Sequence, residues 1–138
     1  MLSYPVEITN TLPRTADLVI VGGGVVGTAT AFFAARAGLG IVLLERRPAL
    51  CTLTTPAATG AFRAQFDNPE EIALVQEGIS LFENFADVTG LMGYDLDLQK
   101  GGYLWLTTLP HVIDRRKALV ARQHGWGLQD VEWLDGDE

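Results

Sequence analysis

The sequence predicts an α/β fold that opens with a βαβ unit on a parallel sheet and continues into a mixed α+β region. Three observations predict it. A β-branched run, Asp17 to Val21, ends abruptly in three glycines. An alanine-rich segment, Val25 to Ala37, follows with helical composition and ends at Gly38, a residue typical of helix C-termini. A second apolar run, Gly40 to Glu45, then completes the unit. Continuous apolar strands are typical of parallel sheets buried on both faces.

The flanking segments of this half are predicted to be irregular. Residues 1–16 contain Pro5 and Pro13 among small polar residues and are expected to form an arm. From Arg46 to Asn68 the pattern dissolves into prolines, threonines and Gly60, which indicates a long extended loop. Loops of this length inside compact domains are usually functional or disordered.

The second half is predicted to be a partial lobe of helices and short strands. Pro69, preceded by Asn68, begins a helix with a regularly spaced apolar face that ends at Gly90. A hairpin over 95–108, turning at Gly101-Gly102, a helix from Pro110 to His124, and a last strand over 131–134 should follow. The expected domains are therefore 1–68 and 69–138.

Composition narrows the functional classes. The 138 residues carry a net charge of −7, so an acidic surface argues against nucleic acid and anionic membranes as partners. Cys51 is the only cysteine, which excludes an internal disulfide and a zinc site of paired thiolates. We expect no signal peptide and no transmembrane segment, and therefore a cytoplasmic location.

The chemistry-bearing motif is a glycine triplet with dinucleotide spacing, Gly22-x-Gly24-x-x-Gly27, between the first strand and the helix. Gly22 permits the turn, Gly24 admits a pyrophosphate close to the backbone, and Gly27 lets the helix pack on the strand. Glu45 ends the second strand, 18 residues after Gly27, where a carboxylate can accept hydrogen bonds from ribose hydroxyls and repel a 2′-phosphate. The spacing predicts a dinucleotide site but does not distinguish NAD from FAD.

The residues also carry a family resemblance. Asp17 to Gly27, Leu43 to Arg46 and Gly60 to Phe66 resemble the FAD-dependent amine and amino-acid oxidases of the D-amino-acid oxidase superfamily. That superfamily includes sarcosine oxidases, glycine oxidases and dye-linked proline dehydrogenases. The resemblance implies a Rossmann-like FAD-binding unit followed by the start of a substrate domain.

The resemblance assigns roles residue by residue. Gly22, Gly24, Val25, Val26 and Gly27 would line the ADP pyrophosphate, Glu45 would hold the adenosine ribose, and Arg46 or Arg47 would lie beside adenine. Thr54, Thr55 and the segment to Ala61 would run along the pyrophosphate and flavin. The loop Thr52–Ala58 lacks a histidine, so no covalent flavin attachment is expected there.

Arg63 matches an arginine that pairs with the substrate carboxylate in sarcosine-oxidase-like members. A guanidinium gives a planar, bidentate grip on a carboxylate and keeps its charge. The alternatives for Arg63 are a solvated loop residue or a ligand of an FAD phosphate.

Family members are much longer than this chain, which lacks the region that supplies most of the substrate sheet. We therefore expect a fragment, or a piece completed by its C-terminal half or by a partner subunit.

The expected function is FAD-dependent oxidation of a small amine or amino acid, with hydride passing to the flavin. Two alternatives remain open: a non-catalytic dinucleotide-binding subunit or fragment, and an NAD-dependent dehydrogenase fragment. No metal site is expected.

Overall fold

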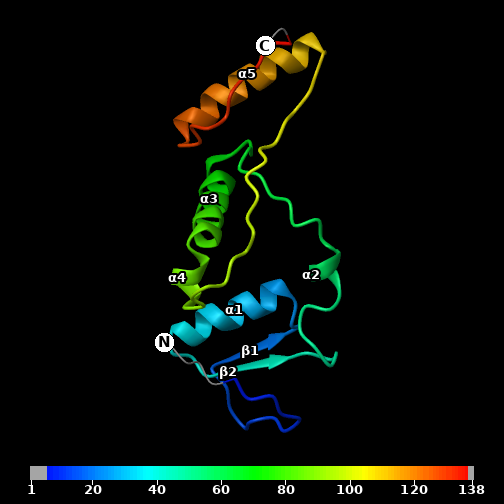
Figure 1. Cartoon of the computed structure of the whole chain (residues 1–138), viewed down its shortest axis with the longest axis vertical. Helices are drawn as coiled ribbons and strands as arrows, with labels where there is room; N and C mark the ends of the chain where they lie inside the picture. The colour runs from blue at the N-terminus through cyan, green and yellow to red at the C-terminus, as the bar shows by residue number, and fades with distance from the viewer. Residues whose placement is uncertain (1–5, 137–138) are drawn as a thin grey trace. The chain divides into compact units, whose positions relative to one another are not determined.

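The computed structural model describes residues 6–136 (Figure 1). The chain divides into two compact units, the first ending at Ala61 and the second beginning at Phe62. The domain boundary expected after Asn68 stays a prediction, and each unit is described by itself below.

The first unit contains the predicted βαβ unit. Strand β1 (Leu18–Val21) leads into helix α1 (Val25–Arg36), and strand β2 (Ile41–Leu44) returns parallel to β1. Leu18 is paired with Ile41 and Val21 with Leu44, so the two strands end at the same sheet edge. Gly38, with φ of +85°, allows the chain to leave α1 and turn into β2. The α/β class and the parallel pairing are thus confirmed.

The sequence predicts strands that are buried on both faces, and this prediction is wrong. Ile20 faces α1, since its Cγ2 lies 3.4 Å from the point that a Cβ on Gly27 would occupy. Val19 and Val21 alternate with it and are 55% and 84% exposed. The prediction failed because α1 covers one face of this two-stranded sheet, and no other element among residues 6–61 covers the opposite face.

The loop after β2 is less extended than expected. A single helical turn, α2 (Thr54–Ala57), interrupts it. Residues 6–16 form no helix or strand, as predicted for the arm; its residues 1–5, with Pro5, lie outside the described residues.

The second unit begins with the predicted helix, but in two pieces. Helix α3 (Pro69–Glu83) starts after Asn68, whose side chain accepts a hydrogen bond from the Glu71 N–H at 2.8 Å. Helix α4 (Phe85–Thr89) then runs to Gly90, which ends it, as predicted, in a left-handed conformation.

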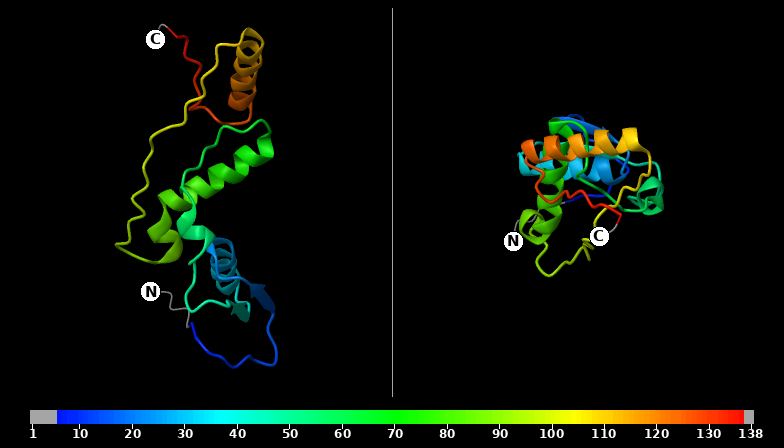
Figure 2. Two further views of the ribbon diagram at one scale, coloured as in Figure 1. Left: turned by 90° about the vertical axis from the view of Figure 1, so that its right-hand side faces the viewer. Right: turned by 90° about the horizontal axis from the view of Figure 1, so that it is seen from above.

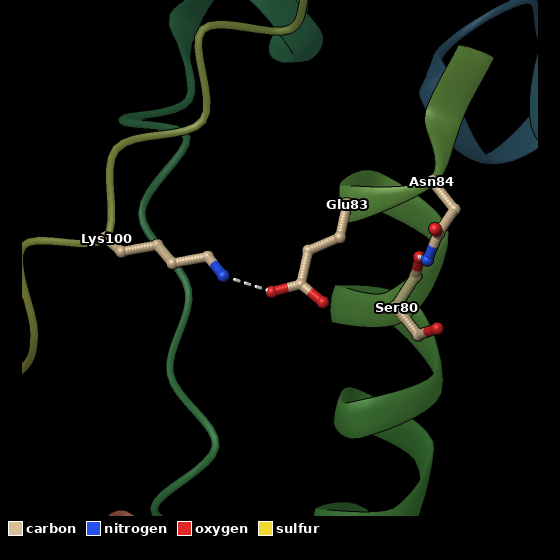
Figure 3. A network of polar contacts seen from close by, with 4 residues as sticks. All are labelled: Ser80, Glu83, Asn84 and Lys100. Atoms are coloured by element: carbon tan, nitrogen blue, oxygen red, sulfur yellow. Dashed lines mark hydrogen bonds and ion pairs between the residues drawn. The ribbon is translucent and has the colours of Figure 1, made fainter.

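The interruption between α3 and α4 falls at Asn84. Its side-chain Nδ2 donates to the Ser80 carbonyl at 2.7 Å, while Glu83 forms an ion pair with Lys100 (Figure 3). An asparagine side chain that bonds to its own helix backbone competes with regular helix geometry. The prediction of one continuous helix rested on the apolar periodicity alone. That periodicity continues past Asn84 and gives no information about the hydrogen bond of its side chain.

The predicted hairpin and last strand are absent from the described residues. Segment 91–109 is an extended trace between α4 and α5 (Figure 2), and neither 95–108 nor 131–134 is assigned to a strand. Leu104 and Leu106 are 68% and 85% exposed. A β-rich sequence becomes a strand only when a neighbouring strand accepts its backbone hydrogen bonds. The described part of the second unit, residues 62–136, contains no such strand.

Helix α5 (Pro110–Gly125) and the segment that follows it contribute most of the core of the second unit. Ile72 of α3 is fully buried against Leu128 and Val131, with Phe66 and Trp126 packed at the margin. The buried Gln123 of α5 donates from Nε2 to the Phe66 carbonyl at 2.7 Å. This bond fixes the end of the segment that carries Arg63.

Candidate functional site

The glycine turn between β1 and α1 has the conformation that its spacing predicts. Gly22 has φ of +104°, a region that residues with a Cβ rarely adopt, and its N–H donates to the Leu44 carbonyl at 2.8 Å. A Cβ on Gly27 would lie 3.1 Å from the Gly22 carbonyl carbon and would overlap its oxygen. Only glycine at position 27 therefore allows α1 to approach the turn this closely.

Glu45 binds the same turn from the end of β2. Its Oε2 accepts the Gly23 N–H and its Oε1 accepts the Arg47 N–H, each at 2.8 Å. The N–H groups of Arg47 and Gly23 hold the pKa of the Glu45 carboxyl below its usual value. The side chain is therefore an anion at neutral pH. Each oxygen can accept a further hydrogen bond, so the carboxylate can receive ribose hydroxyls without leaving the turn.

The loop after β2 closes over the turn. The Cys51 N–H donates to the Gly23 carbonyl at 2.8 Å, and Thr55 Oγ1 accepts the Val25 N–H at 3.1 Å. Leu50 packs so closely on Gly23 that a Cβ at that position would overlap Leu50 Cδ2. The motif leaves position 23 open, and a Cβ there would have to displace the end of the flexible, half-exposed Leu50 side chain, a milder restriction than the backbone overlap at Gly27.

These contacts enclose a cavity of about 310 Å³ beside the N-terminus of α1. Seven of the sequence-predicted residues line it: Gly22, Gly24, Glu45, Arg46, Arg47, Thr54 and Thr55. Val25 lies at its edge through the bond to Thr55.

Three other predicted residues do not line this cavity. Gly27 packs on the turn from behind, Val26 is 77% exposed, and Ala61 lies at the end of the first unit. Sequence reasoning missed Gly23, Cys51 and Leu53, which do line it. For Gly23 a signal existed, because a third consecutive glycine is unnecessary for the spacing alone.

Arg63 lies in the second unit and is half-buried. Its Nε donates to the Gln65 carbonyl at 3.4 Å. Its guanidinium carbon lies 4.8, 5.6 and 5.5 Å from the ring centroids of Phe66, Tyr103 and Trp105. Among the described residues, no carboxylate pairs with it and its two Nη atoms have no hydrogen-bond partner.

Comparison with known proteins identifies the family. The model of the FAD dependent oxidoreductase family matches residues 17–138, which is most of the chain. The chain belongs to this family. This family is FAD-dependent, so FAD is the cofactor and the NAD alternative is set aside.

Two similar proteins are both longer than this chain. It is 34% identical to the FAD-dependent oxidoreductase domain-containing protein 1 of Xenopus laevis over 70% of the chain and 21% of that relative. It is 30% identical to the mitochondrial L-2-hydroxyglutarate dehydrogenase of Caenorhabditis elegans over 99% of the chain and 31% of that relative. The chain thus spans a fifth to a third of these proteins. No solved structure matches it.

The geometry of the glycine turn between β1 and α1 fits the ADP part of FAD. Gly24 has open space up to Thr55 Oγ1, which is 3.6 Å from where its Cβ would stand, so a pyrophosphate can approach the backbone. The first turn of α1 contains no acidic residue, which leaves the positive end of the helix dipole available to phosphate. Among residues 6–136, no helix is long and apolar enough to cross a membrane, and no group of side chains could hold a metal ion.

Proposed function

We propose that this chain is the FAD-binding part of an enzyme that oxidises a small amine or amino acid at the carbon next to nitrogen. The observation that carries the proposal is the glycine turn with Glu45 bound across it, because this arrangement suits the ADP half of FAD. When bound, FAD supplies the acceptor for the hydride. The chain's own residues hold the cofactor: the α1 N-terminus binds the pyrophosphate, Glu45 binds the ribose, and Thr54 and Thr55 lie alongside.

Arg63 is proposed to bind the substrate carboxylate. Its half-burial strengthens its attraction to an anion compared with a fully solvated arginine. Its two Nη atoms match the two oxygens of a carboxylate, and no acceptor within the described part of the chain competes for them. Charge and hydrogen-bonding geometry both favour a carboxylate-bearing substrate over a simple amine.

A second candidate function is oxidation of a 2-hydroxy acid, at CH–OH in place of CH–NH. The relatives named L-2-hydroxyglutarate dehydrogenase favour it, because they match 97–99% of this chain at 30–31% identity. Arg63 suits both substrates, since each carries a carboxylate beside the oxidised carbon. A third candidate is a non-catalytic FAD-binding subunit that acts through a partner chain. A cytoplasmic location is likewise proposed.

Anaerobic reduction of the bound flavin distinguishes these candidates. The holoenzyme that contains this chain is mixed with a panel of amino acids, their N-methyl derivatives and 2-hydroxy acids, and the flavin absorption is followed. Bleaching by an amino-acid or amine substrate supports the proposal. Bleaching by 2-hydroxy acids alone supports the second candidate. A protein with full FAD occupancy that no member of either class reduces indicates the non-catalytic subunit.

A further inference from the structure

The second unit surrounds Arg63 with aromatic rings. Phe66 comes from the same loop, whereas Tyr103 and Trp105 come from a segment 40 residues further along the chain. The Tyr103 and Trp105 rings also contact each other, with centroids 5.4 Å apart. We call these three residues the aromatic cradle. Arginine is well suited to it, because the planar guanidinium stacks on aromatic rings and keeps its charge.

The cradle uses none of the hydrogen-bond donors that a carboxylate needs. Contacts with aromatic rings consume no N–H group, and the Nε–H is taken by the Gln65 carbonyl. The Nη atoms at the end of the guanidinium therefore remain for a ligand, which fixes the edge of Arg63 that can bind. A flexible arginine would have to lose rotamer entropy on binding, and one held this way has lost it already.

Trp105 also contacts a second arginine, which lies on helix α5. The guanidinium carbon of Arg116, on α5, lies 4.8 Å from the Trp105 centroid, so two arginines share one indole. Among the described residues neither arginine forms an ion pair, although the chain is acidic overall. Two like charges against one ring favour an anion close to them.

We propose that Trp105 is a positioning residue that holds Arg63 for the substrate carboxylate and so determines the preference for anionic substrates. This inference rests on the proposed role of Arg63. Trp105 acts through its contact with the arginine.

The test is a binding titration of the holoenzyme with propionate, followed by the change in flavin absorption, with propionamide as the neutral isostere. Trp105→Leu should weaken propionate binding about 3- to 30-fold, the range of a half-buried cation–π contact. Propionamide binding, flavin content and the thermal midpoint should hardly change. Trp105→Phe should recover most of the affinity, because it restores a ring.

Trp133→Leu is the matched control. The Nζ of Lys117 lies 5.0 Å from the centroid of the Trp133 ring, and this ring does not contact Arg63. It should leave propionate binding unchanged. If Trp105→Leu fails to retain flavin, Tyr103→Leu removes another ring of the cradle and carries the same expectation.

The outcomes separate the two claims. If Arg63→Lys weakens propionate binding but neither cradle variant does, the positioning role is overturned and the role of Arg63 stands. If Arg63→Lys has no effect, both are overturned. Equal losses of propionate and propionamide in Trp105→Leu also overturn the positioning role, because they indicate general damage.

Discussion

Replacing Gly27 by alanine probes the steric basis of the glycine turn with a single methyl group. The new Cβ would stand 3.1 Å from the Gly22 carbonyl carbon and overlap its oxygen. The obstructing group is backbone, and the Gly22 N–H is tied to the Leu44 carbonyl, so neither partner can rotate away. Overpacking typically costs 1–3 kcal/mol, and an immobile neighbour places this change at about 3 kcal/mol or more. The α1 N-terminus would have to move off the turn.

We expect Gly27→Ala to weaken FAD binding by about 100-fold or more, since 1.4 kcal/mol corresponds to a factor of ten. The thermal midpoint of the apoprotein should fall as well. FAD affinity is measured by quenching of flavin fluorescence as the apoprotein is titrated into FAD, and the midpoint by circular dichroism.

Gly78→Ala is the matched control, because it adds the same methyl group inside α3. A Cβ there meets nothing within 4 Å, and alanine is a better helix former than glycine by about 1 kcal/mol. This variant should retain FAD affinity and gain stability. Wild-type affinity and stability in Gly27→Ala would refute the steric argument. Losses of the same size in Gly78→Ala would show that the effect of Gly27→Ala is not specific to the glycine turn.

Four further predictions concern the cofactor site and α3. Glu45→Gln should weaken FAD binding about 10- to 100-fold, because it removes charge-assisted hydrogen bonds to the ribose, and an unchanged affinity on titration would contradict that role. The pKa of Glu45 is lowered in the fold, so the stability that its carboxylate contributes is complete above the usual pKa of 4.5 and is lost as the pH falls through the lower folded pKa. The difference in thermal midpoint between wild type and Glu45→Gln should therefore shrink below pH 4.5. A difference that grows below pH 4.5 would contradict the lowered pKa. Asn68→Ala should destabilise the fold by about 1 kcal/mol in urea unfolding, because the Glu71 N–H loses its cap. Acid precipitation of the holoenzyme should leave all yellow colour in the supernatant, whereas colour in the pellet would indicate a covalent flavin.

Local sequence signals predicted the first unit well because its contacts are local. The strand–turn–helix–strand order, the turn at Gly22 and the position of Glu45 all follow from patterns within about 30 residues. The same reasoning failed for the hairpin over 95–108. There the residues have strand propensity, but propensity does not supply a neighbouring strand, and a pair of strands is marginal without further cover.

The candidate site was predictable to the extent that the motif specifies it. The spacing located Gly22, Gly24 and Glu45, whereas Leu50 and Cys51 reach the turn only because of the path of an irregular loop. The cradle around Arg63 was beyond sequence reasoning for a similar reason. Its rings come from positions 66, 103 and 105, and no periodicity connects a loop arginine with a segment 40 residues away.

The glycine turn also has a consequence for chain entropy. Three contacts fasten it to later parts of the chain: Gly23 to Glu45, Gly23 to Cys51 and Val25 to Thr55, across 22, 28 and 30 residues. Closing a loop of 30 residues costs only about 0.3 kcal/mol more than closing one of 22. Once Glu45 has met the turn, Cys51 and Thr55 can therefore attach at almost no further loop-closure cost. The three contacts should form and break as one cooperative step, and amide hydrogens at Gly23, Val25 and Cys51 should then exchange with solvent at similar rates.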